Sequence, residues 1–228
     1  MYLWHEGMAS RGSHEVASCI LKYTKDGNLT ANHLITFSRS CGRQNRNVYM
    51  LSLWLHIVAS DDYPFDTVNQ KFITVGQSYL PNDQDFSSIK TVRHKTNHLY
   101  VPSVGADLIL NARRTNPFTV TAMDQESFVS PEPVSKAFIN WKKNTQKQKV
   151  DVDWLQVKRL RVTKGKLLQF QYQYSLNSLE AWKVVDLKRR CRGRPPDFTM
   201  LPTHQLYNQY ILVSPYRQIK HCTIHIEE

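Results

Sequence analysis

Two acidic residues stand two positions apart in the sequence Leu80-Pro81-Asn82-Asp83-Gln84-Asp85-Phe86. Asp83 and Asp85 are the one acidic pair beside a predicted strand end, and a helix is predicted to start there. Carboxylate oxygens are hard ligands that bind divalent cations. Acidic residues also stabilise a helix start without any metal, by capping it and by interacting with its dipole. The spacing therefore leaves two interpretations open, a metal site and a helix cap.

A second candidate lies in residues 33–47, where an apolar run gives way to a polar turn. Leu34–Phe37 predict a strand, and a helix-like segment begins near Gln44. Because strand ends and helix starts converge on one crevice in an open α/β sheet, catalytic groups collect at this point. A metal-dependent phosphoryl-transfer enzyme needs a carboxylate there, whereas this chain has Arg39.

A basic segment runs Lys188-Arg189-Arg190-Cys191-Arg192-Gly193-Arg194-Pro195-Pro196. Its Arg-Gly-Arg-Pro stretch resembles the core of an AT-hook, an extended segment that lies in the narrow minor groove of A·T-rich DNA. Gly193 would allow close approach to the groove floor, Pro195 would keep the backbone extended, and the flanking arginines would meet the strong negative potential there. A basic linker or a nuclear-import signal is the alternative. Either interpretation predicts a nuclear protein that meets nucleic acid.

The formal net charge of +11 is unevenly distributed. Residues 1–130 hold 12 Lys and Arg and 11 Asp and Glu, whereas residues 131–228 hold 18 and 8. A nearly neutral N-terminal part followed by a basic C-terminal part predicts a globular domain and a region that contacts a polyanion such as DNA.

Cysteine spacing and hydropathy bear on the cellular compartment and on membrane association. The four cysteines are far apart in the sequence, which predicts reduced thiols in a cytosolic or nuclear protein: Cys19, Cys41, Cys191 and Cys222. No apolar run is long enough to span a membrane. The stretch His221-Cys222-Thr223-Ile224-His225 has the spacing of half a zinc site, but because nothing nearby completes four ligands, we interpret it as a chance pattern.

Strands and helices alternate in the front half of the chain. Strands are predicted over residues 2–6, 34–38 and 67–75. Each is followed by a predicted helix: the first has its N-cap at Ser13, the second covers residues 48–58, and the third runs from Asp83 through Ile89. This alternation predicts an α/β fold with a three-layer sheet whose neighbouring strands are parallel.

The pattern weakens after residue 100. It predicts helices over residues 104–114 and 134–141, a short strand over 118–122, and a hairpin of strands 156–163 and 168–174 with a basic tip. Residues 186–202 are rich in Arg and Pro and are expected to be disordered in isolation. We therefore predict a core over residues 1–125, a basic α+β extension over 126–185, and a largely irregular tail over 186–228.

Several sequence blocks occur together in a fixed order. They are Trp4–Gly7, Ala9–Ser13, Glu15, Ser18-Cys19, Ser38, Ser40–Gly42, Gln44–Asn47, Lys71-Phe72, Gly76, Ser78–Asp83, Asp85-Phe86, Asn116–Phe118 and Lys188–Arg190. Together these blocks resemble an uncharacterised, transposase-derived domain family that is widespread in animal genomes. The resemblance covers nearly the whole chain, and it implies a ribonuclease-H-like fold similar to the catalytic core of a DNA transposase.

In folds of that kind, carboxylates hold two cations about 4 Å apart for attack on a phosphodiester. The resemblance implies one carboxylate on an opening strand that would precede Met1, a second at the position of Arg39, and a third at Asp83 or Asp85. A guanidinium stays charged at any relevant pH and repels a cation at about 4 Å by on the order of 1 kcal/mol or more. We therefore expect Asp83 and Asp85 to be vestigial, and Mg²⁺ or Mn²⁺ to bind only if the chain is an active enzyme.

The resemblance also implies an incomplete ribonuclease-H-like sheet, because its opening strands would be missing. Such a sheet exposes an apolar edge, which a partner chain could cover. Three functional hypotheses follow. The chain is a DNA-binding protein without catalysis, acting through basic residues of 142–194; or it is a metal-dependent nuclease or transposase, with Glu6 or Glu15 as a further ligand; or it is a protein-interaction or non-functional product of a decayed mobile element.

Overall fold

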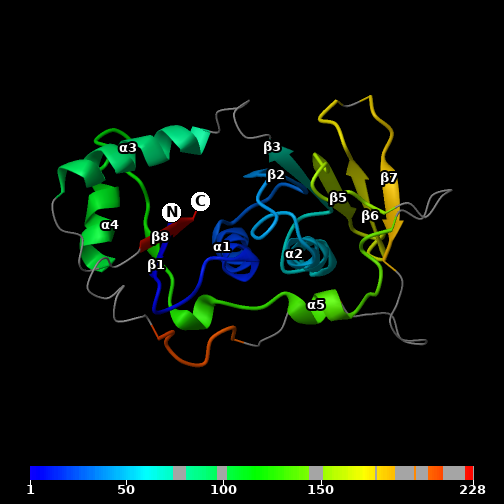
Figure 1. Ribbon diagram of the computed structural model, residues 1–228, viewed down its shortest axis with the longest axis horizontal. Helices are drawn as coiled ribbons and strands as arrows, with labels where there is room; N and C mark the ends of the chain where they lie inside the picture. Colours follow the sequence, from blue (N-terminus) through cyan, green and yellow to red (C-terminus); the bar gives the residue numbers. More distant parts are fainter. Residues whose placement is uncertain are drawn as a thin grey trace.

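The computed structural model describes residues 1–73, 81–96, 102–143, 151–177, 179–187, 198, 205–212 and 224–227. The chain is mixed α/β, with two sheets and helices set between and beside them (Figure 1). Among the described residues, no helix has the length and apolar character needed to cross a bilayer.

The larger sheet has five strands in the order β2-β3-β5-β6-β7. The pair β2 and β3 is parallel, as the helix between them requires, and every other neighbouring pair is antiparallel. Strands from both sides of residue 125 therefore form one sheet. Their bounds are β2 His33–Arg39, β3 Thr67–Ile73, β5 Arg159–Thr163, β6 Gln169–Gln173 and β7 Lys183–Asp186.

The main core lies on one face of this sheet. Side chains of a strand alternate between its two faces, so Val68, Phe72, Leu160 and Val162 point to the same side, and all four are buried. Three helices cover that side (Figure 1): α1 Ser13–Asp26, α2 Val48–Ala59 and α5 Glu132–Lys136. Helix α2 lies deepest, and each of its residues from Met50 to Val58 is buried.

The two long helices of this layer differ in how well their starts were predicted. Helix α2 begins at Val48, as predicted, because the Asn47 side chain accepts the amides of Tyr49 and Met50, each at 3.0 Å. The residues from Gln44 to Asn47, where a helix-like segment was expected to begin, form a turn. The expectation that Ser13 caps α1 is wrong. Gly12 occupies the cap position, and its amide is bound at 2.7 Å by the Glu15 carboxylate.

Strand β1, Tyr2–His5, does not join the larger sheet, which corrects the expectation that the first two predicted strands are neighbours. It pairs parallel with β4, Thr121–Ala122, and antiparallel with β8, Ile224–Glu227. The physical reason is that β1 is apolar on both faces and needs cover on both sides. Leu3 packs with the apolar residues of two helices, α3 Pro81–Lys95 and α4 Pro102–Leu110, while Trp4 packs beside Phe128.

The expected third layer is also not found among the described residues. Helices α3 and α4 pack on β1 instead, so the face of the five-stranded sheet opposite α1 and α2 carries no described helix (Figure 1). At one end of the sheet, β2 has no partner strand on its outer edge in the described part of the chain. Ile35 and Phe37 are 51% and 53% exposed there.

The predicted hairpin is confirmed. Strands β5 and β6 pair antiparallel, and Gly165 turns the chain between them with a φ of +80°, a value that favours glycine. The predicted helices 104–114 and 134–141 are shorter than expected, and strand β7 was not predicted. A short 3-10 turn, Gln125–Ser127, completes the described elements.

Candidate nucleic-acid interface

The structure brings Arg39 and Asp83 together. Arg39 ends β2, Asp83 lies in the first turn of α3, and the guanidinium donates from Nη2 to the carboxylate. The Arg39 side chain is 64% exposed, so the pair is a surface one that contributes about 1 kcal/mol or less to stability. The pair matters for metal binding, because the Asp83 carboxylate, which could bind a metal ion, already has the Arg39 guanidinium beside it.

Asp85 points to a different partner. Arg113 donates from Nη1 to its carboxylate at 2.8 Å, and the same guanidinium lies 4.4 Å from the centre of the Phe118 ring. Among the described residues, no three His, Cys, Asp or Glu side chains gather in a way that could hold a metal ion. The two aspartates are thus each bound to an arginine.

Glu15, considered as a further carboxylate ligand, is a structural residue. It is 2% exposed and accepts hydrogen bonds from Ser10, from Tyr207 and from the Gly12 amide. Burial alone would raise the pKa of Glu15, but these hydrogen bonds outweigh it and hold the pKa below its ordinary value. The carboxylate fastens the segment 205–212 to the start of α1.

Neither Cys19 nor Cys41 forms a disulfide with a described residue. Cys19 is buried in the small core around Trp4, and the Cys41 carbonyl accepts the amides of Asn45 and Arg46 in the turn after β2. Cys191, Cys222 and His221 lie outside the described residues.

A second group of charged side chains lies on the face of the five-stranded sheet that no described helix covers. Strand register places Phe37, Lys71 and Arg159 side by side in one row across β2, β3 and β5. The adjacent row holds Ile35, Asn69 and Arg161. Side chains on the two rows alternate with the buried ones, so both rows point away from α1 and α2. We call this surface the outer face.

Trp182, just before β7, completes the outer face. Its ring centre lies 4.0 Å from the Arg161 guanidinium and 4.9 Å from that of Arg159. Arg161 is held in place by donating from Nε to the side-chain Oδ1 of Asn69 at 2.7 Å. At the other end of the face, the Lys71 ammonium lies 5.0 Å from the centre of the Phe37 ring. The cations of the outer face are thus flanked by an aromatic ring at either end.

The cations of the outer face have no carboxylate partner within the part of the chain that the structure describes. Lys71, Arg159 and Arg161 form no ion pair with a carboxylate of the described residues. Burial, and secondly the repulsion from Arg159, lower the pKa of Arg161. The buried Nε of Arg159 has no hydrogen-bond acceptor in the described part of the chain. An anion placed here would relieve the repulsion and supply that acceptor.

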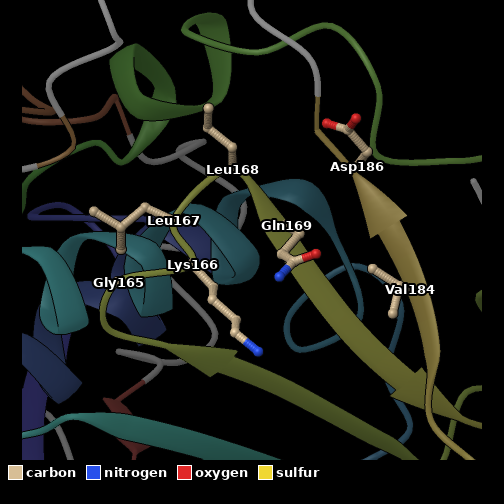
Figure 2. A pocket seen from close by; sticks show the side chains of 7 residues that line it. All are labelled: Gly165, Lys166, Leu167, Leu168, Gln169, Val184 and Asp186. Carbon is tan, nitrogen blue, oxygen red and sulfur yellow. The ribbon is translucent and has the colours of Figure 1, made fainter.

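An open hollow of about 770 Å³ continues this surface towards β7 (Figure 2). It lies beside the β5–β6 turn and is lined by Gly165, Lys166, Leu167, Leu168, Gln169, Val184 and Asp186. Gln169 pairs across the strands with Asp186, so a carboxylate stands at this end of the sheet. The hollow is therefore less suited to an anion than the region around Trp182.

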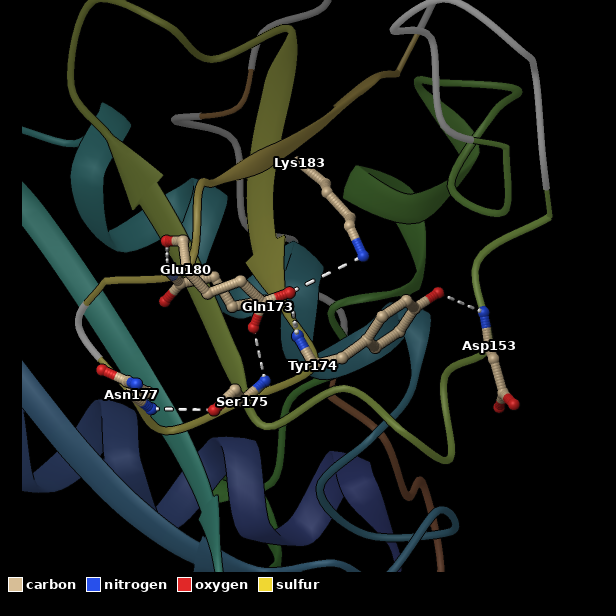
Figure 3. Close-up of polar contacts among 7 residues, drawn as sticks. All are labelled: Asp153, Gln173, Tyr174, Ser175, Asn177, Glu180 and Lys183. Atoms are coloured by element: carbon tan, nitrogen blue, oxygen red, sulfur yellow. Dashed lines mark hydrogen bonds and ion pairs between the residues drawn. The ribbon is translucent and has the colours of Figure 1, made fainter.

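The loop that carries Trp182 is fixed by Glu180 (Figure 3). The Glu180 carboxylate accepts the Ser175 amide at 2.8 Å and pairs with Lys183 at 3.6 Å, while its backbone carbonyl accepts the Gln173 side chain. The Tyr174 hydroxyl accepts the Asp153 amide at 3.0 Å. This network fixes the loop that places Trp182 beside the arginines of β5. Because Lys183 is paired with Glu180, we do not count it among the cations of the outer face.

The basic segment 188–195, with Lys188, Arg189, Arg190, Arg192, Gly193, Arg194 and Pro195, lies outside the described residues. Leu187, the last described residue before it, donates its amide to the Leu168 carbonyl at 2.9 Å, at the end of the β6–β7 ladder.

The sequence carried a signal for part of this interface. Arg159 and Arg161 are two positions apart in a predicted strand, which puts them on one face. Trp182 gave no such signal because β7 was not predicted. A further residue that the sequence did not reveal is Arg46, which is 6% exposed, donates to Ser40 and the Leu155 carbonyl, and supports the end of β2.

Comparisons of this chain with protein-family models, with curated proteins and with solved structures find no significant match.

Proposed function

We propose that this chain is a nucleic-acid-binding protein derived from a transposase-like ancestor, and that it does not cleave DNA. One observation carries the binding part of the proposal. Lys71, Arg159 and Arg161, which form no ion pair with any described carboxylate, lie together with the rings of Phe37 and Trp182 on a sheet face that no described helix covers. Nucleic-acid interfaces are rich in cations of this kind, because each one neutralises a phosphate.

The sequence of the basic segment 188–195 gives a second, independent argument for DNA. Its Arg192-Gly193-Arg194-Pro195 core suits the minor groove of A·T-rich DNA. DNA is accordingly the proposed partner, with the nucleus as the compartment. The uneven charge of the chain supports this, because the excess of basic residues lies in the part that contributes β5, β7 and the segment.

Loss of catalysis is supported by the surroundings of the two aspartates. Asp83 is paired with Arg39 and Asp85 with Arg113, so a cation would have to displace a guanidinium at either carboxylate. A parallel β2–β3 pair joined through α2, with Arg39 at the strand end, is compatible with the ribonuclease-H-like ancestry that the sequence blocks suggest.

The free edge of β2 supports one further partner, a strand supplied by another chain. Its exposed Ile35 and Phe37 flank backbone groups that no described residue binds, and edges of this kind invite pairing.

Fluorescence anisotropy with labelled DNA, measured both as a single strand and as a duplex, tests the proposal. Three phosphate contacts predict that affinity falls on the order of 20-fold for a single strand or 40-fold for a duplex between 50 mM and 200 mM salt, following slopes of about 0.7 and about 0.9 per contact. Binding that does not depend on salt, or no binding at low salt, would contradict the proposed function. The same samples, incubated with Mn²⁺ and run on a denaturing gel, should show no new strand ends.

A further inference from the structure

The outer face carries two aromatic rings, which phosphate binding alone does not require. Its cations lie between two aromatic rings, Phe37 at the β2 end and Trp182 at the β7 end. Phe37 is 53% exposed although it stands in the middle of a strand. A phenyl ring in that position gains nothing from a phosphate, but it offers a flat apolar surface.

Phe37 and Arg159 stand in the same row, two strands apart, which corresponds to about 10 Å at the usual strand spacing. Lys71 lies between them, and the Trp182 ring lies directly beyond Arg159. The row therefore presents a ring, two cations and a second ring in succession. Nucleic-acid single strands offer the matching alternation of bases and phosphates.

A duplex matches this surface less well. The major groove of DNA admits a helix or a two-stranded ribbon, whereas a five-stranded sheet is too broad to enter it. Bases inside a duplex are also stacked on each other, so their faces are hidden from Phe37 and Trp182. Bases of a single strand can instead be splayed onto aromatic side chains, as in sheet modules that bind RNA.

We propose that the outer face binds single-stranded nucleic acid, with bases stacked on Phe37 and Trp182 and phosphates on the cations between them. This inference rests on the proposed function and narrows its ligand at this surface. The segment 188–195 keeps its separate role on A·T-rich duplex.

Two strands with equal numbers of phosphates separate stacking from charge. One is a short oligothymidylate and the other is an abasic strand of the same length. The wild type should bind the oligothymidylate on the order of tenfold more tightly, because each base stacked on an aromatic ring contributes measurably to affinity. The combined change Phe37→Leu and Trp182→Leu should reduce oligothymidylate binding to the abasic level and leave abasic binding unchanged.

A second variant controls for the possibility that loss of the rings disturbs folding. Trp182→Phe, which keeps an aromatic ring, should retain most of the preference for bases, and circular dichroism of each variant should match the wild type. Equal wild-type affinity for the two strands would overturn the stacking inference while leaving the proposed function intact, and so would a preference that survives the loss of both rings. Failure of both strands to bind at low salt would overturn the proposed function as well.

Discussion

Arg39 and Asp83 are 44 positions apart in the sequence, yet their side chains form an ion pair between the end of β2 and the first turn of α3. The pair joins the strand end to the one stretch that carries two aspartates at a helix start. Metal-dependent cleavage of DNA requires carboxylates that are available to cations, whereas in this pair a guanidinium already neutralises the carboxylate.

This pair predicts how Asp83 responds to mutation. Asp83→Ala should change stability by less than about 1 kcal/mol, because the partner Arg39 is exposed. It should not change any strand-nicking signal measured with Mg²⁺ or Mn²⁺, since we expect that signal to be at background in the wild type. Robust nicking that disappears in Asp83→Ala would show that the carboxylate is still catalytic.

Acid should weaken the protein through Glu15. The pKa of Glu15 in the folded state lies below its ordinary value of 4.5, so its carboxylate stabilises the fold above that pH and loses this contribution as the pH falls through the lower folded value. The Glu15→Gln variant should therefore lose less stability than the wild type between neutral pH and pH 3. Urea denaturation at several pH values measures this, with Tyr207→Phe as the variant that keeps the carboxylate and removes one donor.

The free edge of β2 predicts an alternating pattern of amide exchange. The Asn32 carbonyl accepts amides at the start of β3, so the parallel ladder turns the amides of Leu34 and Thr36 towards β3 and those of Ile35 and Phe37 to the outside. Hydrogen exchange followed by NMR should be slow for the first two and fast for the others in a monomer. Slow exchange of all four would mean that a strand from another chain already covers the edge.

Removal of the arginines in the AT-hook-like segment should act on one class of DNA. Arg192→Ala combined with Arg194→Ala should weaken binding to A·T-rich duplex several-fold more than binding to G·C-rich duplex, because the narrow A·T minor groove has the stronger negative potential. Competition between the two duplexes measures the difference. An equal loss of affinity for both duplexes would mean that the segment binds DNA only through nonspecific charge.

The sequence was most informative where a local pattern determines structure. Val48–Val58 is apolar on all sides and became the buried helix α2, and the hairpin strands alternate as predicted. The pairing of β1 with β4 and β8 depends on contacts between residues more than a hundred positions apart, which no local period records. The same limit applies to the candidate interface. Arg159 and Arg161 are visibly on one face, but the absence of a described helix above them follows only from where α3 and α4 pack.

The most direct test compares two double variants that lose the same charge. Arg159→Gln with Arg161→Gln removes two cations of the outer face, whereas Lys22→Gln with Lys136→Gln removes two lysines that pair with carboxylates on the helical side. The slope of log affinity for a single-stranded oligothymidylate against log salt should fall by about 1.4 for the first variant, at about 0.7 per lost phosphate contact, and stay at the wild-type value for the second. Equal slopes for both variants would contradict binding through the outer face.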